Sequence, residues 1–264
     1  MRSSYIIAEV GSNWRGTAHG PGGVRANLEH SYEQILLAKQ AGADAVKFQL
    51  FTARELYGHA VDAATEKRVD QWALPREFVP CLSVMATDIG IDFMCSAFSP
   101  AGYMFVDPSV KMHKIASSEA TAVTILECVE RLNKPTLLSL GIADSAAYGF
   151  IAMACVMDYP ALESDYRLEL LPPGSGLSDH TIGTSLAVRA RQLGYTYFEK
   201  HVDLVGAALL TPDGEVSLNL DEFKEYVAAV RSVSPIAFDS RRRTHSDRYA
   251  RRKSADGEYY RPLS

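Results

Sequence analysis

The chain has 264 residues, of which 47% are hydrophobic and 22% charged, a composition typical of a globular enzyme with one large core. Its net charge of −5 provides no general attraction for nucleic acid or for an anionic membrane surface, so we expect neither as a partner. No apolar run is long enough to span a membrane and the chain opens on no signal peptide, so we expect a cytoplasmic protein.

Short apolar runs alternate with amphipathic stretches, which is the pattern of repeated βα units around a buried parallel sheet. The apolar runs predict eight strands, at Tyr5–Val10, Ala45–Gln49, Ile91–Cys95, Lys111–Ala116, Pro135–Leu140, Phe150–Val156, Ser175–Ser178 and Tyr195–Lys200. The amphipathic stretches predict helices at Ser31–Ala41, Arg76–Ile89, Ala122–Leu132, Thr184–Leu193 and Leu220–Val233. Eight such units predict an α/β fold, the closed (β/α)8 TIM barrel. An open dinucleotide-binding sheet is disfavoured because no glycine-rich turn follows the first strand.

Two connections are too short for a complete outer wall. The segment between Leu140 and Phe150 has no room for an ordinary helix, and the stretch Glu163–Leu171 allows a short one at best. We therefore expect shortened or missing helices after strands five and six. Apolar surface left exposed there favours a homo-oligomer.

The composition changes near the C-terminus. We expect residues 1–238 to form the catalytic barrel and residues 239–264 to form a basic tail, in which arginines alternate with Ser, Asp and Gly. Such a composition is typical of a solvated terminus. The alternative is an arm that packs on another subunit or closes over an anionic substrate.

The four cysteines, Cys81, Cys95, Cys128 and Cys155, show no close pairing. Each lies in an apolar stretch of a predicted helix or strand. This pattern predicts reduced thiols that pack in the core, rather than a disulfide framework or a zinc site.

Two lysines lie inside predicted buried strands, Lys47 in the second and Lys114 in the fourth. A buried ammonium group is costly unless an anionic group pairs with it, and both residues lie towards the strand ends where the site of a barrel opens. With neighbouring hydroxyls they would hold a phosphate and a carboxylate. The alternative is that either lysine forms a structural ion pair with Glu9 or Glu119. The neighbouring hydroxyls are those of Ser117, Ser139 and Ser178.

Two histidines, His180 and His201, end neighbouring strands at equivalent heights. This placement predicts that both imidazoles bind one metal ion. Two protein ligands leave the other positions of an octahedron open for substrate and water, which suits Mn²⁺ or Mg²⁺ better than structural zinc.

The order and spacing of seven motifs extend this interpretation over almost the whole barrel. The motifs are Ile6–Asn13, Ala41–Gln49, Lys114–Glu119, Tyr159–Pro160, Ser178–Thr181, Glu199–His201 and Pro212–Asp213. Together they resemble the sialic acid synthase family, which comprises N-acetylneuraminate synthase and its bacterial relatives.

The resemblance implies an enzyme that condenses phosphoenolpyruvate with a sugar aldehyde, similar to an N-acylhexosamine, to form a nonulosonic-type 2-keto acid with release of phosphate. It implies that the metal polarises the aldehyde oxygen. The residues implied to be catalytic are Glu9, Glu119, Lys47 and Lys114. Those implied to bind substrate are Asn13, Gln49, Ser117, Ser139, Tyr159, Ser178 and Asp213, with His180 and His201 as metal ligands.

Four departures from the family pattern all affect the sugar side. Asn13–Gly16 reads Asn-Trp-Arg-Gly where the family has Asn-His-x-Gly, and the glycine-rich insertion Thr17–Val24 follows. Cys95–Ser99 replaces Ser-Thr-Pro-Phe-Asp, and Val156–Asp158 replaces a polar pair that begins with Thr. The chain also ends before the family's small antifreeze-like domain, which contributes an arginine to the sugar site. We therefore expect an altered acceptor, with Arg15 or an arginine of the tail in place of the missing one.

Two other functions fit parts of the pattern. One is another phosphoenolpyruvate–aldose condensing synthase with a phosphosugar acceptor, for which Arg15 and Arg25 would have to hold the second phosphate. The other is a catalytically silent barrel that binds a sugar or a partner protein. The trimmed wall favours this second function, whereas the intact lysines and histidines oppose it.

Overall fold

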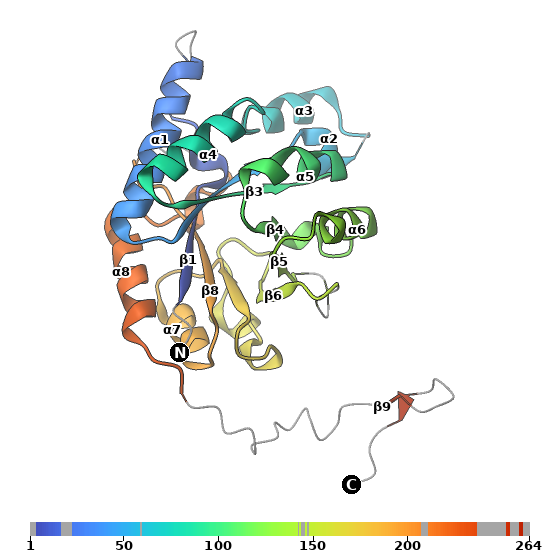
Figure 1. The fold of residues 1–264 in the computed structure, drawn as a ribbon, viewed down its shortest axis with the longest axis vertical. Coiled ribbons are helices and arrows are strands. Elements are labelled where there is room, and N and C mark those ends of the chain that lie inside the picture. Colours follow the sequence, from blue (N-terminus) through green and yellow to red (C-terminus); the bar gives the residue numbers. More distant parts are fainter. Residues whose placement is uncertain are drawn as a thin grey trace.

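Eight parallel strands form one sheet that curves into a nearly closed barrel (Figure 1). The computed structural model describes residues 4–16, 23–58, 60–141, 143, 146, 148–206, 211–236, 252–253 and 259–260. The strands are β1 (Tyr5–Glu9), β2 (Ala45–Leu50), β3 (Asp92–Ala97), β4 (His113–Ile115), β5 (Thr136–Ser139), β6 (Ile151–Ala154), β7 (Gly176–Asp179) and β8 (Tyr197–His201). Each strand overlaps a predicted apolar run, so the predicted α/β barrel is confirmed.

The strand order places the first strand, β1, beside the last strand of the barrel, β8. The order is β3-β2-β1-β8-β7-β6-β5-β4, and β1 pairs in parallel with both β2 and β8. β3 and β4 adjoin each other, but within the described residues no hydrogen-bonded ladder joins them. The barrel therefore has a seam between β3 and β4.

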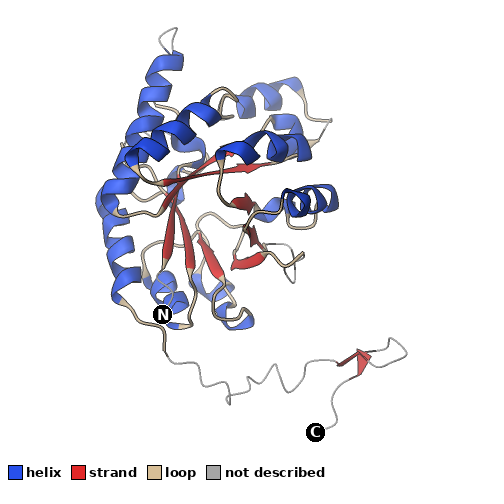
Figure 2. Ribbon diagram, in the orientation of Figure 1, coloured by secondary structure: helices blue, strands red, loops and turns tan. Residues whose placement is uncertain are grey.

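Helices cover the outside of the sheet (Figure 2). They are α1 (Gly23–Ala41), α2 (Ala53–Tyr57), α3 (Ala63–Asp70), α4 (Phe78–Ile89), α5 (Pro100–Val106), α6 (Val123–Leu132), α7 (Ser185–Gln192) and α8 (Leu220–Ser232). Helix α1 begins at Gly23, well before the predicted start at Ser31. The buried positions in its first turns are polar, Asn27 and His30, so they show no hydrophobic period in the sequence.

Three short helices, α2, α3 and α5, were not predicted because they bury too few apolar residues to show a helical period. Each begins at a side chain that accepts hydrogen bonds from the first turn. Thr52 accepts one from Glu55 N, Asp62 accepts from Ala64 N and Thr65 N, and Ser99 accepts one from Gly102 N. Such caps satisfy backbone donors that a helix leaves unpaired.

The outer wall is thin after β5 and β6, as predicted. No helix follows β5 among the residues described there, and only two single-turn 3-10 helices, Glu163–Asp165 and Leu168–Leu170, follow β6. Leu162 and Leu170 on this side are 67% and 63% exposed. This exposed apolar surface is consistent with an oligomer, which stays a prediction.

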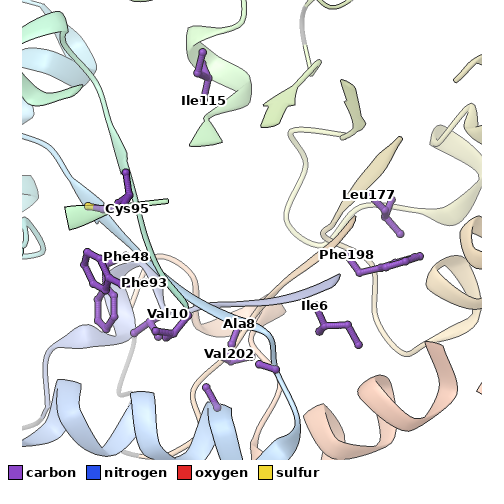
Figure 3. Close-up of a cluster of buried hydrophobic side chains, with 14 of the residues drawn as sticks. Ile6, Ala8, Val10, Phe48, Phe93, Cys95, Ile115, Leu177, Phe198 and Val202 are labelled. Carbon is purple, nitrogen blue, oxygen red and sulfur yellow. The ribbon is translucent and has the colours of Figure 1, made fainter. Parts of the chain in front are cut away.

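Two apolar layers lie on the two faces of the sheet. The larger layer packs the outer face against the helices, and Figure 3 shows Ile6, Ala8 and Phe198 in it. A smaller cluster fills the inside of the barrel with Ile7, Ala45, Met94, Leu137 and Met153. Because successive side chains of a strand point to opposite faces, one strand contributes to both layers. The inner cluster forms an apolar floor beneath the carboxyl ends of the strands.

The four cysteines are free thiols. Cys95 and Cys128 are buried and Cys155 is half-buried, but Cys81 is exposed. The expectation that all four pack in the core is therefore wrong for Cys81, because it lies on the outward face of α4.

Most of the predicted tail, residues 239–264, lies outside the described residues. The described part consists of β9 (Arg252–Lys253) and β10 (Tyr259–Tyr260), which pair in antiparallel fashion. The predicted insertion Thr17–Val24 also lies outside the described residues, apart from the first residues of α1. Within the described ranges, no helix combines the length and the apolar character needed to cross a membrane.

Replacing Phe198 with alanine is expected to lower the free energy of unfolding by about 3–5 kcal/mol, because a fully buried ring leaves a cavity in the outer core. The control variant Met104→Ala removes a side chain that is 58% exposed, and we expect it to change stability by roughly 0.5 kcal/mol or less. Urea denaturation measures both values. Equal losses in the two variants would contradict the placement of Phe198 in the core.

Candidate active site

The inside of the barrel changes from apolar to charged towards the carboxyl ends of the strands. On β1, Ile7 belongs to the apolar floor and Glu9, two residues later, points to the same side. The inward residues Lys47, Lys114 and Glu199 lie above the floor in the same way, on β2, β4 and β8. The sheet geometry thus collects charged side chains from four strands in one place.

Two lysines and two glutamates form an ion-pair cluster at the centre of this site. Lys47 Nζ lies 2.5 Å from Glu9 Oε2 and 3.5 Å from Glu199 Oε2. Lys114 Nζ lies 3.6 Å from Glu199 Oε1. All four side chains are at most 5% exposed. The ion pair between Lys47 and Glu9, one of the sequence-based alternatives, is therefore present, and Glu199 joins the two lysines.

The electrostatics of the cluster are set by burial and by these contacts. Burial alone would raise the pKa of Glu199, but the ammonium groups of Lys114 and Lys47 outweigh burial and lower it to about 2. Burial raises the pKa of Glu9 despite the opposing charge of Lys47. Burial also lowers the pKa of Lys114, which Glu199 only partly opposes. Lys114 is thus the less well neutralised of the two cations.

Hydroxyl groups surround the cluster. Ser178 Oγ donates a hydrogen bond of 3.0 Å to Glu199 Oε1, and Ser96 Oγ accepts one of 3.2 Å from Lys47 Nζ. Ser139 Oγ is buried and has no hydrogen-bond partner among the described residues. Ser117 lies beside Cys155. A buried hydroxyl without a partner is unfavourable, which is consistent with the predicted role of Ser139 in binding substrate; that role stays a prediction.

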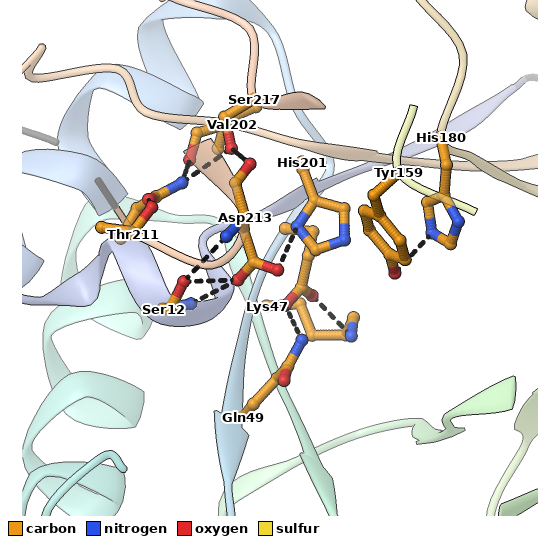
Figure 4. Close-up of polar contacts among 12 residues, drawn as sticks. Ser12, Lys47, Gln49, Tyr159, His180, His201, Val202, Thr211, Asp213 and Ser217 are labelled. Carbon is orange, nitrogen blue, oxygen red and sulfur yellow. Dashed lines mark hydrogen bonds and ion pairs between the residues drawn. The ribbon is translucent and has the colours of Figure 1, made fainter. Parts of the chain in front are cut away.

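The two predicted metal ligands lie side by side at the ends of β7 and β8, with ring centroids 5.5 Å apart (Figure 4). His180 Nδ1 contacts the carbonyl oxygen of Val156 at 2.5 Å, and its Nε2 lies 3.1 Å from the Tyr159 hydroxyl. The Tyr159 ring stacks on His180 at 4.1 Å between centroids. Burial and the neighbouring His201 lower the pKa of His180 to about 3, so the ring is neutral at neutral pH. Neutral imidazole is the form that binds a metal.

The donor set fits a divalent metal held by two imidazoles. The contact with Val156 accounts for Nδ1 of His180 and leaves Nε2 to accept, while the buried Nδ1 of His201 has no hydrogen-bond partner among the described residues. The described part of the chain contains no group of three or more His, Cys, Asp and Glu side chains placed to hold a metal ion. A metal at this site would therefore need ligands from substrate and water, and the predicted Mn²⁺ or Mg²⁺ stays a prediction.

Asp213 connects His201 to the loop after β1. Its Oδ1 lies 3.8 Å from His201 Nδ1, and its Oδ2 accepts hydrogen bonds of 2.7 Å from both the backbone N–H and the hydroxyl of Ser12. Gln49 Nε2 donates to Glu9 Oε1 at 2.9 Å. Gly11 has φ +51°, and a Cβ there would lie 2.4 Å from Asp213 Oδ2, so glycine permits this close approach. The loop after β1 therefore lies directly against the predicted sugar side.

Two of the predicted site residues, Asn13 and Glu119, do not contact the lysine–glutamate cluster. The Asn13 side chain donates to Val202 O and Ser217 Oγ and accepts from Thr211 Oγ1, so it holds the loop after β8 in place. Glu119 lies on a 3-10 turn after β4, is half-buried, and forms no ion pair with another described residue. The structure thus brings Glu9, but not Glu119, into contact with the lysines. Substrate contacts of either residue stay predictions.

Glu199 is the central residue that the sequence analysis did not select. The motif Glu199–His201 contains it, and strand alternation places Glu199 on the same face as His201, so this signal was available. Ser96 and Cys155 were also not selected. They lie on β3 and directly after β6, and neither residue type distinguishes a site from a core.

Trp14 and Arg15, the residues of the loop after β1 that we expected to depart from the family pattern, turn away from the site. Trp14 is buried, donates through Nε1 to Trp72 O and packs edge-on against Phe78 of α4. Arg15 donates to Gln71 O. Both side chains anchor this loop to the segment between α3 and α4.

The chain is similar to known proteins in sequence and in overall fold. Residues 34–241 match the model of the NeuB family. N,N'-diacetyllegionaminic acid synthase of Legionella pneumophila is 28% identical, over 88% of this chain and 72% of its own length. Pseudaminic acid synthase of Helicobacter pylori is 28% identical, over 88% of this chain and 74% of its own length. The crystal structure of N-acetylneuraminic acid (sialic acid) synthetase from Leptospira borgpetersenii serovar Hardjo-bovis has a TM-score of 0.75 at 24% identity, and the match covers 93% of this chain and 89% of that chain.

Acidification is expected to destabilise the protein through Glu199. Its pKa falls from 4.5 to about 2 on folding, so its charged form stabilises the fold above the unfolded pKa, and this contribution is lost as pH falls through the folded pKa. The contribution is on the order of 3 kcal/mol. Urea unfolding between about pH 6 and pH 2 should show a steeper loss of stability for the wild type than for Glu199→Gln. Parallel slopes for the two proteins would contradict the proposed charge state of Glu199.

Proposed function

The chain belongs to the NeuB family, and we propose that it condenses phosphoenolpyruvate with a sugar aldehyde, forming a nonulosonic-type 2-keto acid and releasing phosphate. The observation that carries this proposal is the pair of buried ammonium groups, Lys47 and Lys114, which face one carboxylate beside two histidines. Family membership was the expectation from the motifs, and the family match confirms it.

The lysines support binding of a small dianionic or trianionic substrate. Lys114 is incompletely neutralised, and both ammonium groups lie on the same side of the barrel as the unpartnered hydroxyl of Ser139. Phosphoenolpyruvate carries a carboxylate and a phosphate on one short carbon frame, so two point charges with adjacent hydroxyls match it. On binding, these anions take over the lysine contacts that Glu199 makes in the free protein.

The two histidines indicate where the aldehyde group of the acceptor would bind. When His180 and His201 hold a divalent cation, Mn²⁺ or Mg²⁺, it supplies a Lewis acid for the aldehyde oxygen. Tyr159 and Asp213 adjoin the two rings and are our candidates for contacts with the sugar. Tyr159 is 42% exposed, so it lies where a substrate can reach it from solvent.

The chemical steps use the carboxylates. The C2–C3 double bond of phosphoenolpyruvate supplies the electron pair by which C3 bonds to the aldehyde carbon, which leaves positive charge at C2 and an alkoxide on the aldehyde oxygen. The alkoxide becomes the product hydroxyl by taking up one proton, which the water added in the next step replaces. Water adds at C2, and the resulting intermediate expels phosphate to leave the 2-keto group. We assign Glu9 to accept the proton of this water, because Glu9 lies in the cluster and burial raises its pKa. Glu119 stays a second candidate for proton transfer.

The surroundings of two arginines favour a non-phosphorylated acceptor. A phosphosugar would need a second basic pocket built from Arg15 and Arg25. Arg15 donates to Gln71 O on the outer side of the loop, and Arg25 pairs with Glu29 on the surface of α1 with 90% of its side chain exposed. We therefore propose an N-acylhexosamine-like aldose as the acceptor class.

Phosphate release from phosphoenolpyruvate with Mn²⁺ tests the proposal across a panel of N-acylhexosamines, their deoxygenated relatives and phosphosugars. We expect release with an N-acylated aldose, and we expect His180→Ala and Lys114→Ala to reduce the rate by at least about 100-fold. Lys224→Ala, which changes a half-exposed lysine of α8, is the matched control and should retain the wild-type rate.

The other outcomes separate the alternatives. Release only with phosphosugars would establish the other condensing synthase. A protein that binds neither phosphoenolpyruvate nor Mn²⁺ by calorimetry would be a silent barrel, and the proposal would be wrong.

A further inference from the structure

We propose that Lys200 is a positioning residue that, with Asp179, sets the place of His180 relative to His201. Its side chain lies on the outer face of the barrel, so it touches neither substrate nor metal. The inference rests on the proposed function, because it concerns the metal site assigned there.

The sheet ladder ends immediately before His180. The last paired residues of β7 and β8 are Asp179 and Lys200, which lie opposite each other in the register. Beyond this pair, no described sheet hydrogen bond holds His180 or Thr181. His201 differs, because it remains in register with Glu9 of β1 and its carbonyl accepts a 2.9 Å hydrogen bond from Leu218 N.

Other bonds replace the missing ladder around His180: its own N–H donates to the Tyr166 hydroxyl and its carbonyl accepts from Ala161 N, each at 3.0 Å, and side chains hold the residues on either side of it. Lys200 Nζ donates to the carbonyl oxygen of Thr181, and it lies 3.3 Å from Asp179 Oδ1. The same Asp179 oxygen accepts from Thr181 N at 2.9 Å and from Thr181 Oγ1 at 2.7 Å. The residues before and after His180 are thus fastened to one ammonium group, which belongs to the residue directly before His201.

This polar group is completely enclosed. Asp179 and Lys200 are 0% exposed and Thr181 is 2% exposed. Tyr226 of α8 covers them, with Lys200 Nζ 5.8 Å from the centre of its ring. The phenol of Tyr226 lies beside Asp179, whose charge, after burial, raises the pKa of that phenol.

Stability alone gives little reason for such an ion pair. Desolvation of two charges offsets most of their attraction, and apolar side chains often hold buried strands equally well. The hydrogen bond from Lys200 to the carbonyl oxygen of Thr181, in contrast, is directional, so it fixes the position of the backbone next to His180. We therefore assign the pair to the geometry of the two imidazoles, which must converge within a fraction of an ångström to share one ion.

Mn²⁺ affinity of the full chain tests the proposal, measured from the electron paramagnetic resonance signal of free Mn²⁺. We expect Lys200→Met to weaken Mn²⁺ binding by about 10–100-fold, the range typical of residues that orient metal ligands. Phosphoenolpyruvate affinity, measured by calorimetry in metal-free protein, should be unchanged because Lys47 and Lys114 lie on the inner face. The neutral double variant Asp179→Asn/Lys200→Met leaves no uncompensated charge, and it decides the question if Lys200→Met does not fold.

Lys134→Met is the matched control. Lys134 also pairs with an acid, Asp107, and also donates to backbone carbonyls, but it lies before β5 and away from the histidines. The Lys134→Met variant should unfold more easily than the wild type but bind Mn²⁺ with the same affinity. Wild-type Mn²⁺ affinity in the double variant, or an equal loss of affinity in Lys134→Met, would overturn the proposal while leaving the metal site intact. Absence of Mn²⁺ binding by the wild type would remove the metal site itself, and the role of Lys200 with it.

Discussion

Two ammonium groups and two carboxylates share the desolvated interior of the barrel, and the rest of the site is arranged around them. Lys47, Lys114, Glu9 and Glu199 are tolerated there because each contacts an opposite charge. The neutralisation is uneven, since Lys47 contacts both carboxylates, whereas Glu199, at 3.6 Å, is the single ion-pair partner of Lys114 among the described residues. Such a cluster is a poor stabilising device, and under the proposed function an entering anion replaces Glu199 as the partner of both lysines.

Strand alternation explains how one small sheet supports both a core and this cluster. On β8, Phe198 and Lys200 point outward, whereas Glu199 and His201 point into the barrel. The outward set packs against the helices, and the inward set meets side chains from the other strands. Lys200 and its partner Asp179 on β7 differ from the apolar outward residues, because they carry charges into the outer layer, and Lys200 also bonds to the backbone next to His180. The backbone next to His180, a proposed metal ligand, is thus held from the face opposite the site.

The loop after β1, which we propose lies on the sugar side of the site, is where we expect this chain to differ from the pattern of its family. Trp14 and Arg15 replace residues of the first loop and anchor it to the segment between α3 and α4 instead of entering the site. Asp213 and Tyr159 remain beside the histidines. The thin wall after β5 and β6 lies next to Val156, whose carbonyl oxygen contacts His180. The cluster of lysines, glutamates and histidines, together with the altered first loop, is the physical basis for proposing the same reaction type with a different acceptor.

The sequence by itself determined the eight strands and the thin wall, and it singled out Lys47, Lys114, His180 and His201, which the structure brings together inside the barrel. These features depend on local patterns, such as apolar periodicity, segment length and a charged residue inside an apolar run. It did not show that Glu199 is the residue both lysines contact, that Glu119 lies apart from them, or that α1 begins at Gly23. The first two facts depend on the relative register and tilt of strands far apart in the chain, which decide which side chains meet. The start of α1 was missed because the buried positions of its first turns, Asn27 and His30, are polar. Only the tertiary structure could place Lys200 against Thr181, because that bond joins two strands at the point where their ladder ends.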